Sequence, residues 1–293
     1  MGGDDVTTYL VTGATGKTGG RVLRGLVAAG ETDVRGMTRS EDKAADIKEA
    51  GGNAVVADMA EPSTLEAALS GVDRVYLVAE SGERQAEHEG NVVDSARAAG
   101  VTRIVKLSVV GVASDSPVRF GRAHAEAEAA VEASGIPYTF LRPNGFMQNN
   151  MGHAATIREQ GRFYAPYDDA PIALIDAEDI AVAAVVALRE DGHEGKSYDL
   201  TGPEALTNPD LAERYSKVLG REITWVDVPE ADVLETMRGF GYPEWNLAGF
   251  SELWTIYRAG YAATPASGIR DVTGREPRSY DDFIEQHRGA FGG

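Results

Sequence analysis

The segment VTGATGKTGG, residues 11–20, constrains the fold more than any other part of this sequence. It spaces Gly13, Gly16 and Gly19 as G-x-x-G-x-x-G, directly after the strand-like run TTYLVT and before the helix-like run RVLRGLVAAG. Glycines at such a turn let the main chain approach a pyrophosphate, and the amides that begin the helix bind it. Because a second strand-like run follows, the motif has the context it requires, and it predicts a dinucleotide site. A tight turn without a ligand is the alternative interpretation.

The first half of the chain alternates short β-branched runs with helix-like segments, which is the pattern of parallel strands joined by crossover helices. Several of the helices end in a glycine before the next strand, as left-handed termination favours, at Gly30, Gly51, Gly100 and Gly135. The sequence therefore predicts an α/β fold with a doubly wound parallel sheet. The expected strands are Thr7–Thr12, Asp33–Thr38, Asn53–Ala57, Arg74–Val78, Arg103–Ser108 and Tyr138–Leu141.

After Pro143 the alternation becomes less regular, which indicates a smaller lobe interleaved with the sheet. We therefore expect a cofactor-binding domain over residues 1–150, with sheet contributions from later residues, and a smaller substrate lobe over residues 151–293. The expected helices of the later region are Ala155–Gln160, Glu178–Leu188 and Asn208–Leu219, and the expected strands are Ser197–Leu200 and Glu222–Val228.

Composition excludes several classes of function. A net charge of −18 argues against nucleic-acid binding, because that affinity comes mainly from Lys and Arg. Zero cysteines exclude disulfides and thiolate metal sites and fit a cytoplasmic protein, and no metal-binding cluster is visible. The start of the chain, MGGDDVTTYL, has no pattern of a secretory signal, and no uncharged apolar run approaches the ~18 residues that would span a membrane.

The end of the second strand predicts which dinucleotide binds. An NAD enzyme normally places Asp or Glu there, whereas an NADP enzyme needs a cation for the 2′-phosphate. This chain has Thr38, Arg39 and Ser40 at that end, while Asp33 lies at the opposite end of the strand. Arg39 therefore favours NADP(H). Lys17 in the glycine loop is a second candidate for the same phosphate, with a solvated loop lysine as the alternative.

Other candidate residues follow the ends of later strands. Asp58 and Met59 come after the third strand, where an adenine ring would lie, although Asp58 is equally suited to cap the helix that starts near Pro62. The fourth strand ends at Ala79 and Glu80 and the fifth at Ser108, where strand order reverses, so we expect the nicotinamide end there.

Taken together, these segments and several later ones resemble the NmrA-like branch of the atypical short-chain dehydrogenases, nearly from end to end. This resemblance implies an NADP-binding, Rossmann-like fold, in a family that contains NAD(P)H-dependent quinone and azo-dye reductases and also regulators that bind the cofactor without reducing anything. It also implies that Asn144, Gly145 and Phe146 lie against the nicotinamide. The segments that carry the resemblance are GATGKTGG, TRS, VKLSVVGV, HAEAEAAVEASGIPYTFLRPNGFMQNN, IALIDAEDIAVAAVVAL, YDLTGPEALTNPDLAERYSKVLGREI and TGREPRSYDDFIEQH. The candidate cofactor-binding residues are Gly13, Thr15, Gly16, Lys17, Thr18, Gly19, Arg39, Asp58, Met59, Ala79, Glu80, Ser108, His124, Pro143, Asn144 and Phe146.

The chain departs from short-chain dehydrogenases at the Tyr-x-x-x-Lys pair, where the corresponding spacing reads Phe120-x-x-x-His124. No phenol is available there to protonate a substrate oxygen. Phe120, His124, Ala127 and Val131 share an apolar helix face, so the imidazole is expected to point towards the sheet. His124 is the candidate catalytic residue, with a hydrogen bond to ribose or substrate and a packed core histidine as the alternatives.

The missing phenol favours acceptors whose reduced form is weakly basic. Reducing a ketone gives an alkoxide whose conjugate acid has a pKa near ~16, whereas a quinone gives a phenolate with a pKa near ~10. The difference is roughly 8 kcal/mol, so water or His124 can complete the protonation. We therefore predict an NADPH-dependent oxidoreductase of quinone-like, azo or other conjugated acceptors, acting as a monomer or homodimer. The candidate substrate-binding residues are Phe146, Met147, Phe163, Tyr164 and Trp245.

Two other functions stay open. A cofactor-sensing regulator would bind NADP(H) without turnover, and the absence of the dehydrogenase proton donor is consistent with it. A ketone or imine reductase would need a donor from the later lobe, such as Tyr164.

Overall fold

The computed structural model describes residues 6–293, so the first five residues of the N-terminal segment, MGGDD, lie outside the described residues. A seven-stranded sheet has the order β3-β2-β1-β4-β5-β6-β8, and every neighbouring pair from β3 across to β6 is parallel. The order reverses between β1 and β4, as a doubly wound sheet requires. The strands are β1 (Thr8–Val11), β2 (Asp33–Thr38), β3 (Asn53–Val56), β4 (Arg74–Leu77), β5 (Arg103–Leu107), β6 (Tyr138–Pro143) and β8 (Lys196–Leu200).

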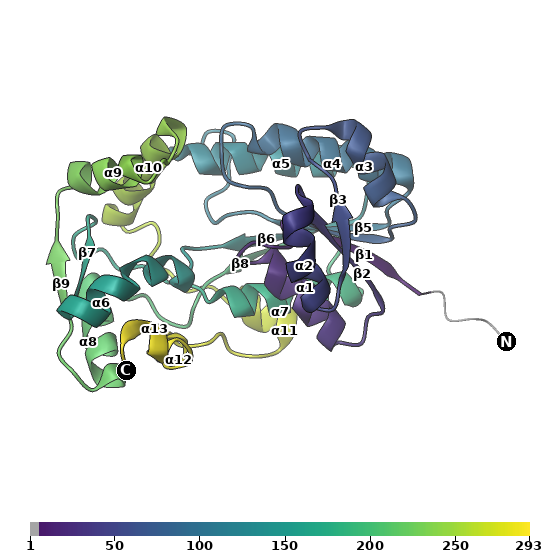
Figure 1. Ribbon diagram of the computed structural model, residues 1–293. Coiled ribbons are helices and arrows are strands. Elements are labelled where there is room, and N and C mark those ends of the chain that lie inside the picture. The colour runs from purple at the N-terminus through teal and green to yellow at the C-terminus, as the bar shows by residue number, and fades with distance from the viewer. Residues whose placement is uncertain (1–5) are drawn as a thin grey trace. The chain divides into compact units, whose positions relative to one another are not determined.

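Helices cover both faces of this sheet. Figure 1 shows α3, α4 and α5 over one face and α1 and α7 over the other. Gly25 of α1 packs against Val185 of α7, where a β-carbon would lie 2.9 Å from that side chain. The helices are α1 (Gly19–Ala28), α2 (Ala44–Glu49) after the short η1 (Glu41–Lys43), α3 (Pro62–Leu69), α4 (Gln85–Ala99), α5 (Arg119–Ser134) and α7 (Ala177–Arg189).

The expected α/β fold is confirmed, and each of the six strands expected up to residue 141 is present with its ends within two residues of the prediction. Gly30, Gly51, Gly100 and Gly135 all have positive φ, between 75° and 91°, which confirms their predicted role at helix ends.

The chain forms two compact units. The first contains the residues up to Ser116, Phe120–Arg142 and Ile180–Tyr198, and the second contains Pro117–Arg119, Pro143–Asp179 and Asp199–Gly293. Each unit has its own apolar core. The segment Ile180–Tyr198 thus belongs to the first unit although it follows residue 150. The expected division into a cofactor-binding and a substrate-binding part near residue 150 stays a prediction.

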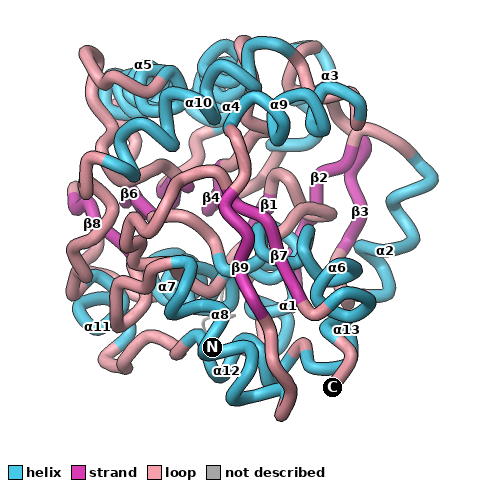
Figure 2. Tube along the Cα trace, turned by 90° about the vertical axis from the view of Figure 1, so that its left-hand side faces the viewer, coloured by secondary structure: helices cyan, strands magenta, loops and turns pink. Residues whose placement is uncertain are grey.

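The second unit contains a small parallel sheet of β7 (Arg162–Ala165) and β9 (Thr224–Asp227), which Figure 2 shows side by side. The expected strand Glu222–Val228 contains β9. β7 was not expected, because the run RFYA is only four residues long and pairs with a segment that comes much later in the chain. The remaining elements of this unit are η2 (Met147–His153), α6 (Ala154–Gln160), α8 (Asn208–Leu219), α9 (Glu230–Gly239), α10 (Glu244–Arg258), α11 (Gly268–Thr273), α12 (Tyr280–Gln286) and α13 (Arg288–Phe291).

Candidate functional site

The glycine turn closes tightly between β1 and α1. Gly13 has a φ of 56°, and its carbonyl oxygen accepts the Gly16 N–H at 2.8 Å. A β-carbon at Gly19 would lie 2.2 Å from that same oxygen, so only glycine fits there. Thr18 precedes the helix and makes no side-chain capping bond, while the Gly20 and Arg21 N–H groups donate to the carbonyl oxygens of Gly16 and Thr18 at 3.3 and 2.9 Å. The exposed positions in the loop are Thr15, Gly16 and Lys17.

The turn is anchored to the neighbouring strand β4. The Thr12 hydroxyl accepts the Val78 N–H at 2.8 Å and lies 2.9 Å from the Val78 carbonyl oxygen, to which it can donate. A β-carbon at Gly13 would lie 2.9 Å from the Val78 side chain. The ends of β1 and β4 are therefore held together directly beneath the loop.

Two predicted phosphate ligands are exposed in the first unit. The Arg39 guanidinium, just past the end of β2, is 71% exposed and lies 3.6 Å from the Glu80 carboxylate, which is 83% exposed. An exposed ion pair of this kind contributes little stability, so Arg39 can exchange Glu80 for a phosphate at small cost. Desolvation, followed by the charge of Arg21, lowers the pKa of Lys17.

Asp58 closes a turn and does not cap the helix, contrary to one of its two interpretations. Its Oδ1 accepts the Ala60 N–H at 2.9 Å, and the residue at the N-cap of α3 is Glu61. The neighbouring Met59 packs against the core of the first unit, and its carbonyl oxygen accepts from the Asn91 amide at 2.9 Å. An adenine contact from either residue stays a prediction.

The ends of β4 and β5 present the predicted nicotinamide-side residues. The Ala79 N–H donates to Glu89 Oε1 at 3.1 Å. The Ser108 N–H donates to the Leu141 carbonyl oxygen at 2.7 Å, whereas the buried Ser108 hydroxyl has no hydrogen-bond partner among residues 6–293. A buried hydroxyl without a protein partner is a group that a ligand or water would satisfy.

His124 is buried beneath these strand ends. Its Nδ1 lies 3.0 Å from Lys106 Nζ, and Lys106 in turn forms an ion pair of 2.9 Å with Glu89 in which both side chains are fully buried. Gln85 Nε2 lies 3.1 Å from His124 Nε2. Burial, and then the charge of Lys106, holds the pKa of His124 well below its usual 6.5. The ring points into the fold as predicted, and its role as a general acid stays a prediction.

Lys106, Glu89 and Gln85 were not among the predicted site residues. A signal for one of them exists, because Lys106 interrupts the strand RIVKL, in which every residue is buried. A lysine inside a strand of a parallel sheet covered on both faces needs a partner, since charged side chains are almost never fully buried unpaired. No comparable signal identifies Glu89 or Gln85 on their helix.

The predicted nicotinamide residues of the second unit belong to a hydrogen-bonded turn that follows Pro143. Both ends of the Asn144 amide are engaged within that unit, since Nδ2 donates to the Ala262 carbonyl oxygen at 3.0 Å and Oδ1 accepts the Gly145 N–H at 2.9 Å. Phe146 pairs with Ile175 in an isolated parallel bridge and is partly exposed.

The predicted substrate residues divide into two groups. Met147 and Phe163 are each 2% exposed and belong to the core of the second unit, so their contact with a substrate stays a prediction that burial does not favour. Tyr164 and Trp245 are partly exposed. The Tyr164 hydroxyl donates to Gln160 at 3.0 Å, and the Arg119 guanidinium lies 5.6 Å from the centre of the Trp245 ring.

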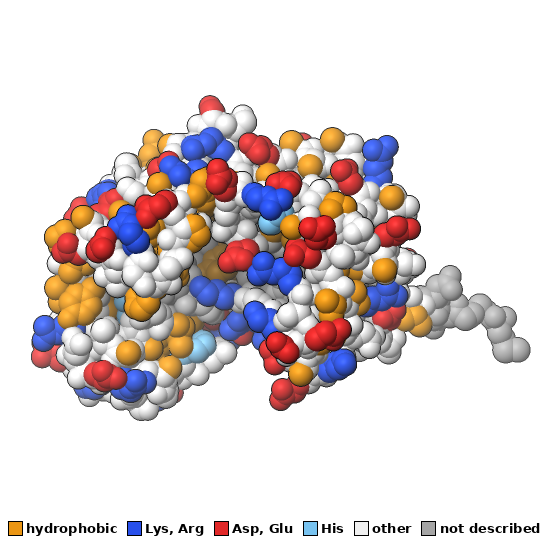
Figure 3. Space-filling view, turned by 45° about the horizontal axis from the view of Figure 1, so that its top comes forward, with side chains coloured by type: hydrophobic (Ala, Val, Ile, Leu, Met, Phe, Trp, Pro, Cys, Tyr) orange, Lys and Arg blue, Asp and Glu red, His pale blue; other side chains and the backbone are white. Residues whose placement is uncertain are grey.

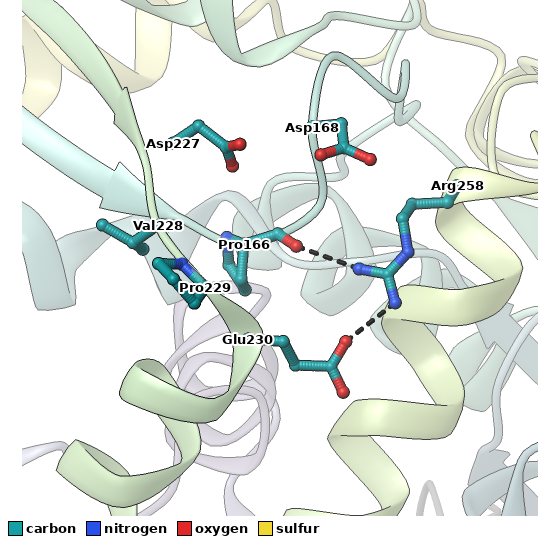
Figure 4. A pocket seen from close by; sticks show the side chains of 7 residues that line it. All are labelled: Pro166, Asp168, Asp227, Val228, Pro229, Glu230 and Arg258. Carbon is teal, nitrogen blue, oxygen red and sulfur yellow. Dashed lines mark hydrogen bonds and ion pairs between the residues drawn. The ribbon is translucent and has the colours of Figure 1, made fainter.

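A separate pocket of about 370 Å³, lined by both charged and apolar side chains, lies within the second unit. Figure 4 shows Arg258 crossing it, with one nitrogen donating to the Pro166 carbonyl oxygen at 2.9 Å and another bonded to Glu230 at 2.7 Å. None of the predicted site residues lines it. The lining residues are Pro166, Asp168, Asp227, Val228, Pro229, Glu230 and Arg258.

Two other kinds of feature are absent among the described residues. Within residues 6–293, no group of three or more His, Asp or Glu side chains is placed to hold a metal ion. In the same range, no helix combines the length and apolar character needed to cross a bilayer. On the face shown in Figure 3, basic side chains are interspersed with acidic ones.

The residues at the strand ends of the first unit fit a dinucleotide. The turn admits no side chain at Gly19, Arg39 is exposed one strand away, and the Ser108 hydroxyl needs a partner. The structure thus brings together, along one edge of the sheet, the residues predicted from Gly13 to Ser108.

Comparisons with known proteins identify relatives over nearly the whole chain. The model of the NmrA-like family matches residues 6–264. The NAD(P)H azoreductase of Xenophilus azovorans is 36% identical over 97% of this chain and 99% of that protein. Quinone oxidoreductase 2 of Escherichia coli is 33% identical over 80% of this chain and 82% of that protein. A crystal structure of the NADPH-dependent quinone oxidoreductase of Escherichia coli with NADPH matches with a TM-score of 0.85 and 28% identity, covering 96% of this chain and all of that one.

Proposed function

The chain belongs to the NmrA-like family, and from that membership we propose that it is an NADPH-dependent oxidoreductase that reduces quinone-like, azo or other conjugated acceptors. One observation carries the proposal. At the carboxyl ends of neighbouring strands, the glycine turn has no room for a β-carbon at Gly19, and the cation Arg39 is exposed one strand away. The relatives whose names specify azo and quinone reduction supply the class of acceptor.

The first unit holds the cofactor in this proposal. The turn from Gly13 to Gly19 and the start of α1 bind the pyrophosphate, and Arg39, assisted by Lys17, binds the 2′-phosphate. Asp58 and Met59 lie on the adenosine side, and Ser108 offers its hydroxyl near the nicotinamide. When bound, NADPH supplies the hydride.

The chain's own contribution to the chemistry is positioning, because the position of the short-chain dehydrogenase tyrosine is occupied by Phe120. Quinone-type acceptors do not need a strong acid, since the phenolate they form has a pKa near ~10. Positioning of the reactants, which is worth several kcal/mol in general, suffices for such acceptors. The burial and lowered pKa of His124 favour water over this imidazole as the source of the proton.

The second unit supplies the acceptor-binding residues in this proposal, with the partly exposed Phe146, Tyr164 and Trp245 as the leading candidates. Flat aromatic acceptors suit such side chains. We assign the cofactor to residues 1–150 and the acceptor to residues 151–293, and we propose a cytoplasmic monomer or homodimer.

Turnover with a panel of acceptors tests the proposal. NADPH consumption is measured with quinones, azo dyes, ketones and imines, together with the affinities for NADPH and NADP⁺. We expect turnover with quinones or azo dyes. Tight binding that distinguishes NADPH from NADP⁺, without turnover, would instead establish a cofactor sensor. Turnover of ketones or imines alone would indicate a reductase that uses a proton donor such as Tyr164.

A further inference from the structure

Lys106 is a buried ammonium with three polar partners. Its Nζ lies 2.9 Å from the Glu89 carboxylate, 2.9 Å from the Leu107 carbonyl oxygen and 3.0 Å from His124 Nδ1. The contacts to Leu107 and His124 are hydrogen bonds, whereas the contact to Glu89 is an ion pair in which Oε2 accepts no hydrogen bond from residues 6–293. With Glu89 ionised, the pair carries no net charge, which is the arrangement that a site without solvent tolerates best.

This arrangement determines where the proton of His124 lies. A neutral imidazole has one donor nitrogen and one acceptor nitrogen. Because Nδ1 accepts from Lys106, the ring proton must be on Nε2. Protonating Nδ1 as well would place two cations 3.0 Å apart, away from water.

Gln85 lies against the same ring without deciding its tautomer. Its Nε2 is 3.1 Å from His124 Nε2 and 3.2 Å from His124 Nδ1, so it is almost equally close to both ring nitrogens and in line with the N–H of neither. Its Oε1 has no hydrogen-bond partner among residues 6–293. The tautomer of His124 therefore depends on Lys106.

The network also joins the strand ends that carry predicted cofactor residues. Glu89, on α4, accepts the Ala79 N–H just past β4, and Lys106 donates to the Leu107 carbonyl at the end of β5. His124 brings in α5. The ends of two strands and two helices of the first unit thus meet at one buried ion pair, immediately before Ser108.

We propose that Lys106 and Glu89 are positioning residues that hold His124 as the neutral Nε2–H tautomer and fix the ends of β4 and β5 for cofactor binding. His124 is then a positioning residue as well, and its Nδ1 is not a source of protons. The part of this proposal that concerns the cofactor rests on the proposed function, whereas the tautomer does not.

Nitrogen NMR of the histidine side chains tests the tautomer in the full chain without added cofactor. The chain has five histidines, and the His124 signals are assigned as those missing from a His124→Gln variant. We expect a neutral Nε2–H ring that does not titrate between about pH 5 and 8, a range that spans the usual pKa of histidine. A neutral Nδ1–H ring, or an imidazolium at pH 7, would overturn the assignment.

A double variant tests the cause. Glu89→Gln with Lys106→Met removes both charges at nearly constant volume and leaves no buried ion unpaired. We expect His124 to lose its fixed tautomer, and NADPH binding to weaken by about tenfold, the equivalent of one or two net hydrogen bonds. A tautomer identical to that of the wild type would show that Lys106 does not set it, and an unchanged affinity for NADPH would refute the role at the strand ends.

The matched control is Arg84→Met with Glu87→Gln, which makes the same exchange in an exposed ion pair of 2.7 Å at the start of the same helix. We expect it to leave the His124 signals unchanged. If the buried double variant does not fold, the wild-type spectrum still decides the tautomer. If the wild-type protein does not bind NADPH, the proposed function fails while the tautomer result stands.

Discussion

A β-carbon on Gly19 would lie 2.2 Å from the carbonyl oxygen of Gly13, closer than any real contact of this kind. The close approach brings the start of α1 against the end of β1. The N-terminus of α1 therefore lies next to the glycine loop, where it can bind a diphosphate.

Gly19→Ala is therefore expected to open the turn. We predict a loss of about 1–3 kcal/mol in the free energy of unfolding, together with a large loss of affinity for NADPH. Denaturant unfolding and cofactor titration measure the two effects. Gly90→Ala, in the interior of α4 with open space around it, is the control; it is expected to leave NADPH affinity unchanged and to raise the free energy of unfolding by about 0.5–1 kcal/mol, since alanine is the better helix former. A Gly19→Ala protein that binds NADPH normally would contradict the assigned turn.

Arg39→Ala is expected to weaken NADPH binding at least about tenfold, since a charge-assisted bond to phosphate is lost. NADH binding is expected to change little, because NADH lacks that phosphate. Titration of both cofactors measures the difference, with Arg97→Ala, an exposed arginine on α4, as the control. Equal losses for the two cofactors would show that Arg39 does not contact the 2′-phosphate.

His124→Gln is expected to lower kcat with a quinone by less than tenfold and to raise the KM for NADPH. A general acid typically contributes about 10² to 10⁴ in rate, and a buried neutral imidazole bonded to Lys106 is not such an acid. Steady-state kinetics separate the two parameters. A fall in kcat of a hundredfold or more at unchanged KM would restore His124 as the proton donor.

Asp179 gives the second unit a pH-dependent stability. Burial, only partly offset by the bond from the Arg278 N–H, raises the pKa of this carboxyl from 3.8 to about 6, and the charge of Asp176 adds to the shift. The folded state therefore holds the proton more tightly than the unfolded state. The resulting stabilisation is complete below pH 3.8 and is lost as the pH rises through about 6.

Asp179→Asn removes this dependence. We expect the variant and the wild type to be similar near pH 4, and the variant to gain up to about 3 kcal/mol relative to the wild type by pH 7. Denaturant unfolding at several pH values measures the gap, with the exposed Asp169→Asn as the control. A gap that is constant with pH, or that narrows as the pH rises, would contradict the raised pKa.

Much of the first unit could be predicted from the sequence, because local rules determine it. The period of apolar residues, the glycines that end helices and the spacing of the turn each act over a few residues. The strands of the first unit, and the candidate cofactor residues from Gly13 to Ser108 at their ends, could therefore be predicted. Local rules determine less of the second unit. Phe163 was predicted to contact a substrate, and its side chain is buried against Tyr215 with ring centres 5.9 Å apart, so that contact stays a prediction that burial does not favour.

By itself, the sequence determined the turn, the order of helices and strands, and the absence of a phenol at Phe120. The tertiary structure alone decided the state of His124, because its partners Lys106 and Gln85 lie 18 and 39 residues away in the chain. An amphipathic pattern shows which face of a helix is buried. It does not show which buried charge will meet that face, since this depends on how separate strands and helices pack in three dimensions.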